Sequence, residues 1–368
     1  MPSIKLLLLF VVLASSSVGV EAKKRLVFVQ AIWRHGDRAP SSLPYPNDEN
    51  TERYWPRGWA QLTNEGMRQV EKLGEFFRDR YADSFVDEHF NVSQVYIRSS
   101  DSDRALVSAQ AFMHGFFPPD KKERFDDDLK WQPLPIHSSG PGKDPLLRPT
   151  DYDCPAYDQH LEEFKKPIVD QLTAKYADFL SSPSVIGNPA GQLSVEEAAG
   201  LDDLSREIAH DLEQPDWVTR EWAQYDGNTS LEIVMELQRV LRNAEFGDFK
   251  LAFLRGGLLL NDWTARAERV VRGNQSHPTH MNLYSSHDGT LLALLHNLQL
   301  ADGQLVPYAA CVIMEIYEDN GQHFVQFLYR HEEKTSQLSV RNCEEECPLD
   351  EFYCHSSWVD KNEVPTAR

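Results

Sequence analysis

The amino-acid sequence predicts an α/β protein with a mixed, mainly parallel central sheet, helices on both of its faces and a smaller helical insertion. Three features of the sequence predict this fold. Three apolar strand-like segments are each followed by a polar cluster and a helical pattern. Two alternating strands meet at a tight turn near the end, and the middle of the chain has helical periodicity without convincing strands.

The first strand is expected over residues 25–33, which are rich in β-branched and aromatic side chains. It ends at the polar sequence Arg34-His35-Gly36-Asp37-Arg38, whose glycine permits a tight backbone path. A helix is then expected over residues 65–80, because apolar side chains recur there at helical spacing, with Thr63 or Asn64 as its cap.

The second and third units repeat the order of strand, polar cluster and helix. They comprise residues 94–98, 99–101 and 105–116 in the second unit, and residues 281–285, 286–289 and 290–298 in the third. Two further strands are expected over 309–317 and 323–329, because their side chains alternate and Asp319-Asn320-Gly321 between them is a strong hairpin-turn signal.

The middle of the chain predicts a mostly helical insertion beside the sheet. Helices are expected over residues 160–164, 168–180, 195–212 and 231–245, and Pro167 is expected to interrupt the first two. A helix over residues 253–271 leads back to the sheet. The resulting division is a sheet domain of residues 23–118 and 250–354, a loop-rich and helical cap of residues 119–249, and a polar tail of residues 355–368.

Residues 1–22 have the features of a secretory signal peptide, with a positive charge at Lys5, an apolar core from Leu6 to Ala14, and small residues before a cleavage site after Ala22. A membrane anchor is the weaker interpretation, because the apolar core is too short to cross a bilayer comfortably and polar serines follow it. We therefore expect a protein without a membrane span that is secreted or resides in a lumen such as that of the lysosome.

The formal net charge of −20 argues against nucleic acid or an anionic membrane surface as a partner. A small anionic substrate would need a local positive patch on such a protein, and Arg34, Arg38 and a later arginine could form one. No nucleotide-binding glycine loop is present, and the two histidines within residues 277–280 are weak evidence for a metal. The sequence predicts neither a metal nor a cofactor.

Five cysteines follow the predicted signal peptide, and an oxidising compartment favours disulfides. Cys343 and Cys347 are close enough to join in a short loop, whereas a zinc site there would lack a second suitable pair. Cys154 with Cys354 would tie the middle of the chain to its end, and Cys311 in an apolar strand is the candidate for a buried, unpaired thiol. Three sequons are candidate glycosylation sites, of which we expect two to be used: Asn91, Asn228 and Asn274.

The three polar clusters are expected to converge. In open α/β sheets, ligands bind beyond the carboxyl ends of the parallel strands. The N-termini of the following helices present unpaired amides and a positive dipole end there, which favour phosphate. We therefore expect an anion site where residues 34–38, 98–100 and 287–289 meet.

The residue types in these clusters are those of phosphoryl transfer. An imidazole can act as a nucleophile, so His35 is the expected nucleophile, and Asp288 is the natural proton donor to an alkoxide leaving group. Arg104, inside the following helix, could support the site from behind, and Asp37 is interpreted as a loop residue. The groups expected to hold the phosphoryl oxygens are Arg34, Arg38, Arg98 and His287.

The expected pH dependence follows from the charges around His35 and Asp288. Neighbouring arginines keep His35 neutral and nucleophilic in acid, but they also lower the pKa of Asp288, which must be protonated to act as an acid. Bound phosphate and an acidic medium both offset the second effect. We therefore expect activity that is highest at acid pH and falls toward neutral pH.

Three segments of the sequence occur together in a known family. They are the pattern R-H-G-x-R-x-P at residues 34–40 with His287-Asp288 far downstream, the segment Tyr96-Ile97-Arg98-Ser99-Ser100-Asp101, and the segment Trp131-Gln132-Pro133-Leu134-Pro135-Ile136-His137. The chain resembles in these segments the histidine acid phosphatases, a branch of the histidine phosphatase superfamily, and most of all those of prostatic and lysosomal type. The likeness covers roughly the whole chain after residue 22, and the helical middle least.

The resemblance implies the histidine phosphatase fold and the roles given above for the nucleophile, the proton donor and the phosphate-binding groups. It implies no metal, and a homodimer whose contact involves the segment with Trp131 and His137. It also implies a third disulfide that this chain leaves open, because Cys311 has no evident partner. The two disulfides that it does imply are Cys154–Cys354 and Cys343–Cys347.

The expected function is that of a secreted or luminal acid phosphatase, which hydrolyses phosphate monoesters through a phosphohistidine intermediate. One alternative is a narrower specificity in the same family, for phytate, a lysophospholipid or a sugar phosphate. A phosphomutase fits the signal peptide poorly. A non-catalytic binding protein on this fold should have lost a catalytic residue, whereas this chain retains every expected one.

Overall fold

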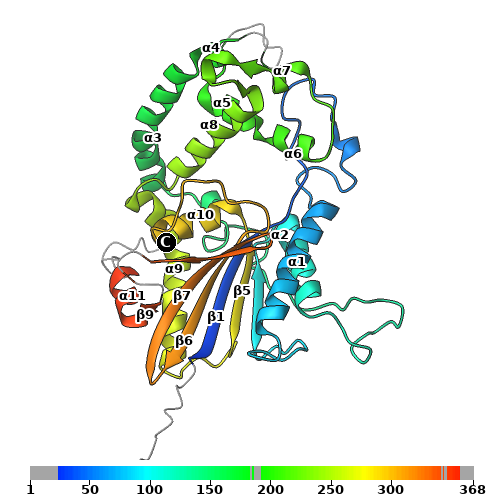
Figure 1. Ribbon diagram of the computed structural model, residues 1–368, viewed down its shortest axis with the longest axis vertical. Coiled ribbons are helices and arrows are strands. Elements are labelled where there is room, and N and C mark those ends of the chain that lie inside the picture. Colours follow the sequence, from blue (N-terminus) through cyan, green and yellow to red (C-terminus); the bar gives the residue numbers. More distant parts are fainter. Residues whose placement is uncertain (1–23, 183–184, 186–191, 341–342, 344–345, 357–368) are drawn as a thin grey trace, which may run out of the picture.

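The computed structural model describes residues 24–182, 185, 192–340, 343 and 346–356, and for residues 354–356 it describes the backbone alone. The predicted signal peptide and the polar tail beyond residue 356 lie outside the described residues. Figure 1 shows two parts, a sheet flanked by helices and a group of helices beyond one end of the sheet.

In the described part of the chain, the central sheet has seven strands in the order β2-β5-β1-β6-β7-β8, with β9 beside β7. They are β1 (Arg25–Arg34), β2 (Val95–Ser99), β5 (Met281–Ser286), β6 (Cys311–Asp319), β7 (Gln322–His331), β8 (Lys334–Leu338) and β9 (Cys347–Pro348). β5 pairs in parallel with β1 and with β2, and the other pairings are antiparallel.

The mixed sheet is confirmed, but its parallel part is smaller than the mainly parallel sheet expected. It comprises only β2, β5 and β1, the three strands that precede the polar clusters. The hairpin between β6 and β7 turns at Asn320 and Gly321, both with positive φ. So short a connection can join only antiparallel neighbours, which accounts for the antiparallel pairing of β6 with β7.

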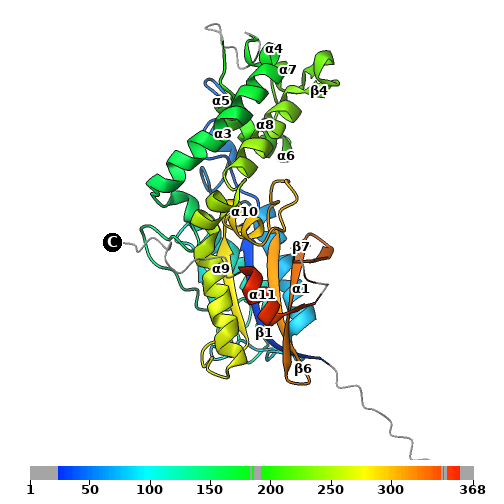
Figure 2. The same cartoon turned by 90° about the vertical axis from the view of Figure 1, so that its left-hand side faces the viewer.

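Helices cover both faces of the sheet, as expected (Figure 2). α1 (Asn64–Tyr81) and α2 (Asp103–Phe116) pack on one face, and α9 (Phe249–Val271), α10 (Asp288–Asn297) and α11 (Leu349–Ser356) pack on the other. β1 contributes to both cores, with Ala31 and Trp33 on the α1 side and Phe28 and Ile32 on the α9 side. Burial on both faces explains why the sequence of β1 is a continuous apolar run.

The helical cap is built around a third apolar core, which contains Phe179, Leu204, Ile233 and Leu237. Its helices are α3 (Pro155–Lys175), α4 (Ala177–Leu180), α5 (Val195–Ala199), α6 (Leu204–Ala209), α7 (Asp216–Thr219) and α8 (Ser230–Ala244). Its two short strands are β3 (Glu221–Trp222) and β4 (Asn228–Thr229). The described 3-10 turns are η1 (Glu52–Tyr54), η2 (Pro149–Asp151), η3 (Gly200–Asp203) and η4 (Ala223–Tyr225).

Two expectations about the cap helices are wrong. Pro167 lies inside α3 and does not interrupt it. Both Pro167 and Glu163, whose carbonyl loses its helical donor, lie on the exposed side of α3, where water can replace the missing hydrogen bond. The helix expected over residues 195–212 is instead divided into α5 and α6 by the turn η3.

Part of the predicted cap segment 119–249 lies on the sheet edge. His137 donates a backbone hydrogen bond to the carbonyl of Ile97 (3.1 Å), and Ser99 donates one to the carbonyl of His137 (2.8 Å). The segment around His137 therefore continues the sheet beside β2, and the helical cap begins only at Pro155.

The cysteines are placed in three different situations. Cys343 and Cys347 form the expected disulfide, and Cys311 is buried and free, as expected. Cys154 has no disulfide among the described residues, and the side chain of Cys354 lies outside them, so the bond between these two remains a prediction.

None of the helices described in the structure combines the length and the apolar character needed to cross a membrane. In the same part of the chain, no group of three or more His, Cys, Asp or Glu side chains is arranged to hold a metal ion.

Candidate active site

The segment after β1 is held against the neighbouring strand and the first turn of α1. The backbone N–H of His35 donates to the carbonyl of Ser286 at 2.9 Å, so the β1 and β5 clusters are joined directly. A Cβ atom on Gly36 would overlap the backbone of Gly66 in α1, and one on Gly66 would overlap Asp37. The close approach of two backbones therefore requires glycine at both positions.

The ring of His35 is buried and oriented by its own backbone. Its Nδ1 lies 2.7 Å from the carbonyl oxygen of Gly36, which can only accept, so Nδ1 carries the proton and donates. The Nε2 atom is then unprotonated, and the Nε–H of Arg104 points at it from 3.1 Å. His35 is 2% exposed, and its Nε2 lone pair faces a guanidinium group.

The β1 cluster also contains Arg34, whose charge acts on His35, and Arg38. Arg34 donates from Nη1 to the carbonyl of Val306 at 2.6 Å, and its guanidinium lies 4.0 Å from the centre of the Tyr308 ring. Arg38 donates to the carbonyl of Ala39 at 2.7 Å. Carbonyl and ring partners fix Arg34 in place without a counterion among the described residues, whereas Arg38 also has the carboxylate of Asp203 at 3.8 Å.

The polar cluster between β5 and α10 lies beside His35. The rings of His35 and His287 have centroids 5.5 Å apart, and His287 Nε2 lies 2.8 Å from the hydroxyl of Ser100 at the end of β2. Asp288 is the first residue of α10. The three polar clusters therefore meet, as the sequence predicts.

Asp288 is bound by an arginine from the cap. Arg242 in α8 donates from Nε to a carboxylate oxygen of Asp288 at 2.9 Å, and from Nη1 to Glu245 at 2.6 Å. A Cβ atom on Gly289 would collide with the Arg242 guanidinium, so glycine after Asp288 makes room for this contact. The ion pair joins the cap to the polar cluster at the start of α10.

Burial and charge perturb the titration of these groups. Burial, followed by the charge of Arg34, lowers the pKa of His35 well below 6.5. Burial and the charge of Arg104 lower the pKa of His287 to about 3. Burial alone would raise the pKa of Asp288, but Arg242 and Arg34 outweigh it and hold that pKa well below its ordinary value.

Burial also lowers the pKa of two of the arginines, Arg38 and Arg104, to about 10. Both remain protonated at acid pH. Among the described residues, no carboxylate lies within ion-pair distance of Arg34 or Arg104, and the nearest one to Arg38 is Asp203 at 3.8 Å. Partly buried cations such as Arg34 and Arg104, with no carboxylate at ion-pair distance among the described residues, favour an anionic ligand.

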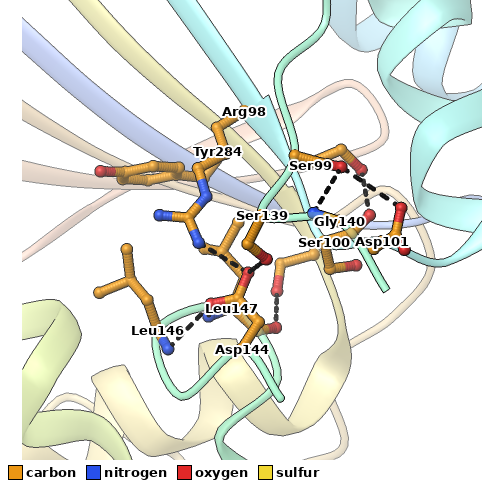
Figure 3. A network of polar contacts seen from close by, with 12 residues as sticks. Arg98, Ser99, Ser100, Asp101, Ser139, Gly140, Asp144, Leu146, Leu147 and Tyr284 are labelled. Atoms are coloured by element: carbon orange, nitrogen blue, oxygen red, sulfur yellow. Dashed lines mark hydrogen bonds and ion pairs between the residues drawn. The ribbon is translucent and has the colours of Figure 1, made fainter. Parts of the chain in front are cut away.

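The structure does not place Arg98 beside His35. Arg98 donates to a carboxylate oxygen of the buried Asp144 at 2.8 Å, and Ser139 donates to the same oxygen at 3.1 Å (Figure 3). The reason is the alternation of β2: Ile97 and Ser99 are buried toward α2, so Arg98 projects from the other face. The phosphate-binding role expected for Arg98 is not supported by its position.

Arg104, expected only as a support from behind, is the arginine that contacts His35 directly. It lies in the first turn of α2, at the N-terminal end that faces the site. The sequence contains the signal in Asp101-Ser102-Asp103-Arg104, a helix start whose first turn carries the cation. Asp37, expected in a loop, accepts from Thr63 (2.5 Å) and lies 2.6 Å from His210 Nε2.

The sequence did not point to the groups that other regions contribute. Arg242 and Tyr308 reach the site from the cap and from the loop before β6. No motif marks either residue, because each approaches through tertiary packing. Together the site offers an unprotonated imidazole nitrogen, a carboxyl group and several fixed cations around a common space.

Comparisons with known proteins agree with this chemistry. Residues 25–330 match the model of the histidine phosphatase superfamily (branch 2). The chain is 35% identical to lysosomal acid phosphatase of Xenopus laevis over 95% of this chain and 80% of the relative. It is 34% identical to prostatic acid phosphatase of Rattus norvegicus over 93% of this chain and 89% of the relative.

Solved structures of low sequence identity share the fold. The phytase of Klebsiella sp. ASR1 superposes with a TM-score of 0.69 at 15% identity, over 94% of this chain and 98% of that one. The phytase of Hafnia alvei does so with a TM-score of 0.66 at 17% identity, over 91% and 97%.

Proposed function

This chain belongs to the histidine phosphatase superfamily (branch 2), and on that premise we propose that it is an acid phosphatase that hydrolyses phosphate monoesters through phosphorylation of His35. The observation that carries the proposal is the state of the His35 ring. Its Nδ1–H is committed to the Gly36 carbonyl, and its unprotonated Nε2 atom accepts a hydrogen bond from the Nε–H of Arg104. A neutral imidazole with one oriented lone pair beside fixed cations is suited to attack phosphorus.

In the first half-reaction, Nε2 of His35 attacks phosphorus and forms a P–N bond while the P–O bond to the leaving group breaks. Asp288 gives its proton to the leaving oxygen, so an alcohol departs. The groups proposed to hold the phosphoryl oxygens are Arg34, Arg38, Arg104 and His287. Arg104 takes the role that the sequence assigned to Arg98.

In the second half-reaction, the Asp288 carboxylate accepts a proton from water as the water oxygen attacks phosphorus. The P–N bond breaks, inorganic phosphate leaves, and His35 and protonated Asp288 are restored. Asp288 must be protonated at the start of each cycle. The ion pair with Arg242 lowers the pKa of Asp288, so activity is favoured at low pH. The negative charge of a bound phosphoryl group opposes the arginines and brings protonation of Asp288 within reach.

The test is hydrolysis of 4-nitrophenyl phosphate near pH 5 by the wild type and by His35→Ala. We expect His35→Ala to lose about 10⁴-fold or more in kcat, whereas His89→Ala, which removes an exposed histidine, should change little. Acid-quenched protein should carry the phosphoryl label on His35, and chelator should have no effect. Label on another residue, or turnover retained by His35→Ala, would contradict the proposal.

Export and assembly belong to the same proposal. The relatives named lysosomal and prostatic acid phosphatase favour a lysosomal or extracellular location, in which the predicted signal peptide and glycans would fit. Asn274 is exposed, and Asn91 and Asn228 are half-buried. A homodimer through the edge segment that contains Trp131 and His137 would be detected by light scattering.

A further inference from the structure

The segment from Asp144 to Asp151 is fixed against the start of α10. The carbonyl of Leu147 accepts hydrogen bonds from the hydroxyls of Ser286 (2.7 Å) and Thr290 (2.9 Å), which flank His287 and Asp288 in the chain. A Cβ atom on Gly289 would lie 3.0 Å from the methyl carbon of Thr150. This loop therefore lies directly beside the proposed proton donor.

The other end of the segment is anchored by Asp144, which is 2% exposed. Its carboxylate accepts from Arg98 and Ser139 through one oxygen and from the backbone N–H groups of Leu146 and Leu147, both at 3.1 Å, through the other (Figure 3). Its carbonyl accepts from the N–H of Arg148 at 2.8 Å. A buried carboxylate with this many donors holds a loop in one conformation.

This anchored loop carries Arg148 beside the start of α10. Arg148 follows the carbonyl that binds Ser286 and Thr290, and its side chain is 31% exposed. Its charge contributes to the low pKa of His287 and to that of Arg104, so it shares the field of the site. Its ion-pair partner is Asp151, which is 46% exposed on the solvent side.

We propose that Arg148 is a specificity-determining residue that binds a second anionic group, carried by the leaving group of the substrate. The proposal rests on the proposed function. Substrates of this class are phosphate monoesters whose alcohol bears another phosphate or a carboxylate. Arg148 would form a charge-assisted hydrogen bond with that second group while the other cations hold the phosphoryl group.

Arg148 lies on a different side of the site from the arginines proposed to bind the phosphoryl group. Asp288 must face the leaving oxygen to protonate it, and the Arg148 loop packs on Gly289, next to Asp288. Arg34 and Arg104, by contrast, lie around His35, where phosphorus is attacked. Arg148 therefore borders the leaving-group side, and its partial exposure lets a substrate reach it.

A pair of substrates with the same carbon skeleton tests the proposal. Glycerol 3-phosphate has a neutral leaving group, and 3-phosphoglycerate has a carboxylate on it. We expect Arg148→Gln to lower the ratio of kcat/KM for 3-phosphoglycerate to that for glycerol 3-phosphate by about tenfold, the size of one charge-assisted contact. A second pair, fructose 1,6-bisphosphate and fructose 6-phosphate, tests a phosphate as the second anionic group. We expect Arg148→Gln to lower its kcat/KM ratio in the same way.

Two variants control the comparison. Lys143→Gln removes a positive charge from the same loop, where Lys143 pairs with the exposed Asp153, and should leave the ratio unchanged. Arg148→Lys keeps the charge and should retain most of the preference, which added salt should weaken in the wild type. A ratio that is the same in wild type and Arg148→Gln, for both substrate pairs, would overturn the inference.

The outcome also distinguishes the two proposals. If the wild type hydrolyses neither member of a pair and no phosphohistidine forms, the proposed function has failed. If His35 is phosphorylated and the esters are cleaved, but Arg148→Gln affects both members of each pair equally, only the role of Arg148 has failed.

Discussion

The two walls of the candidate site differ in how their charges are balanced. On the sheet side, Arg34 and Arg104 are held by a carbonyl, a ring and a histidine, without a carboxylate at ion-pair distance among the described residues. On the cap side, three arginines each pair with an acidic residue three or four positions away in the chain: Arg206 with Asp202, Arg239 with Glu236, and Arg242 with Glu245.

This difference separates binding from positioning. A partly buried cation that lacks a counterion is stabilised when an anion binds, so the sheet wall favours an anionic ligand. The carboxylates that pair with these cap arginines are 22–32% exposed, so the cap arginines gain less from phosphate and instead fix the elements they join, whereas Asp151 beside Arg148 is 46% exposed and can give way to a substrate anion. Arg206 binds the Tyr308 hydroxyl (2.7 Å) and Arg242 binds Asp288, so the cap orients side chains that belong to the other wall.

The largest expected effect contrasts the two arginines that follow β2. Arg104→Gln removes a donor from the His35 site and should lower kcat by about 10²–10³-fold. Arg98→Gln should lower it by less than about tenfold, while it destabilises the fold by about 2 kcal/mol because Asp144 loses a charged partner. The measurements are steady-state kinetics and urea unfolding of both variants. Equal losses of activity in Arg104→Gln and Arg98→Gln would contradict the assignment of phosphate binding to Arg104 rather than Arg98.

The second prediction concerns the pH profile. Without its Arg242 partner, the partly buried Asp288 should titrate at higher pH, because burial favours the protonated carboxyl group. Since an acid catalyst works only while protonated, the falling limb of kcat/KM against pH should move upward in Arg242→Gln. An alkyl phosphate with a poor leaving group is the substrate of choice. A limb that stays in place or moves downward would contradict the role of Asp288 as proton donor.

The third prediction concerns stability in acid. The folded-state pKa of His287 is about 3, below the ordinary 6.5, so between these values the unfolded chain binds a proton that the folded protein excludes. Stability must therefore fall as pH drops through this window, by about 2 kcal/mol from His287 between pH 6.5 and pH 5. Urea unfolding of His287→Asn at several pH values should show a correspondingly shallower decline than the wild type. Parallel curves would show that His287 titrates normally.

The smallest expected effect is on the contact between His210 of the cap and Asp37. His210→Gln should cost about 1 kcal/mol in unfolding free energy and change kcat/KM only modestly, since Asp37 retains its hydrogen bond from Thr63. His89→Gln, in an exposed pair, should cost less than about 0.5 kcal/mol. If His210→Gln lost as much activity as Arg104→Gln, the contact between the cap and Asp37 would have to contribute to substrate binding.

Local pattern predicted the sheet wall well. The apolar runs and glycine-bearing turns predict β1, β2 and β5. The carboxyl ends of parallel strands share one sheet edge, so His35, His287 and Asp288 are expected to lie together. Nearness to a strand end is not enough to predict the position of Arg98, because strand alternation turns neighbouring side chains to opposite faces. Helical geometry instead brings Arg104 back to the site.

The cap wall could not be predicted in the same way. Arg242 is 46 positions from Asp288 in the chain, and Arg206 is 102 positions from Tyr308. Such contacts depend on how α6 and α8 settle against the sheet domain, and no short motif encodes that packing. Tertiary packing also explains why α3 continues through Pro167. The proline is tolerated because it lies on the exposed side of the helix, which the local sequence does not predict.

The backbone contact between Gly36 and Gly66 restricts how this protein can evolve. Even one added methyl group there would push the turn after β1 away from α1, so substitutions at either position are disfavoured. New substrate preferences must arise elsewhere, and the segment around Arg148 is free to vary because its framework is held by Asp144 and by main-chain carbonyls. A mutant library aimed at altered selectivity should therefore be built at Arg148 and its neighbours, with the turn after β1 left intact.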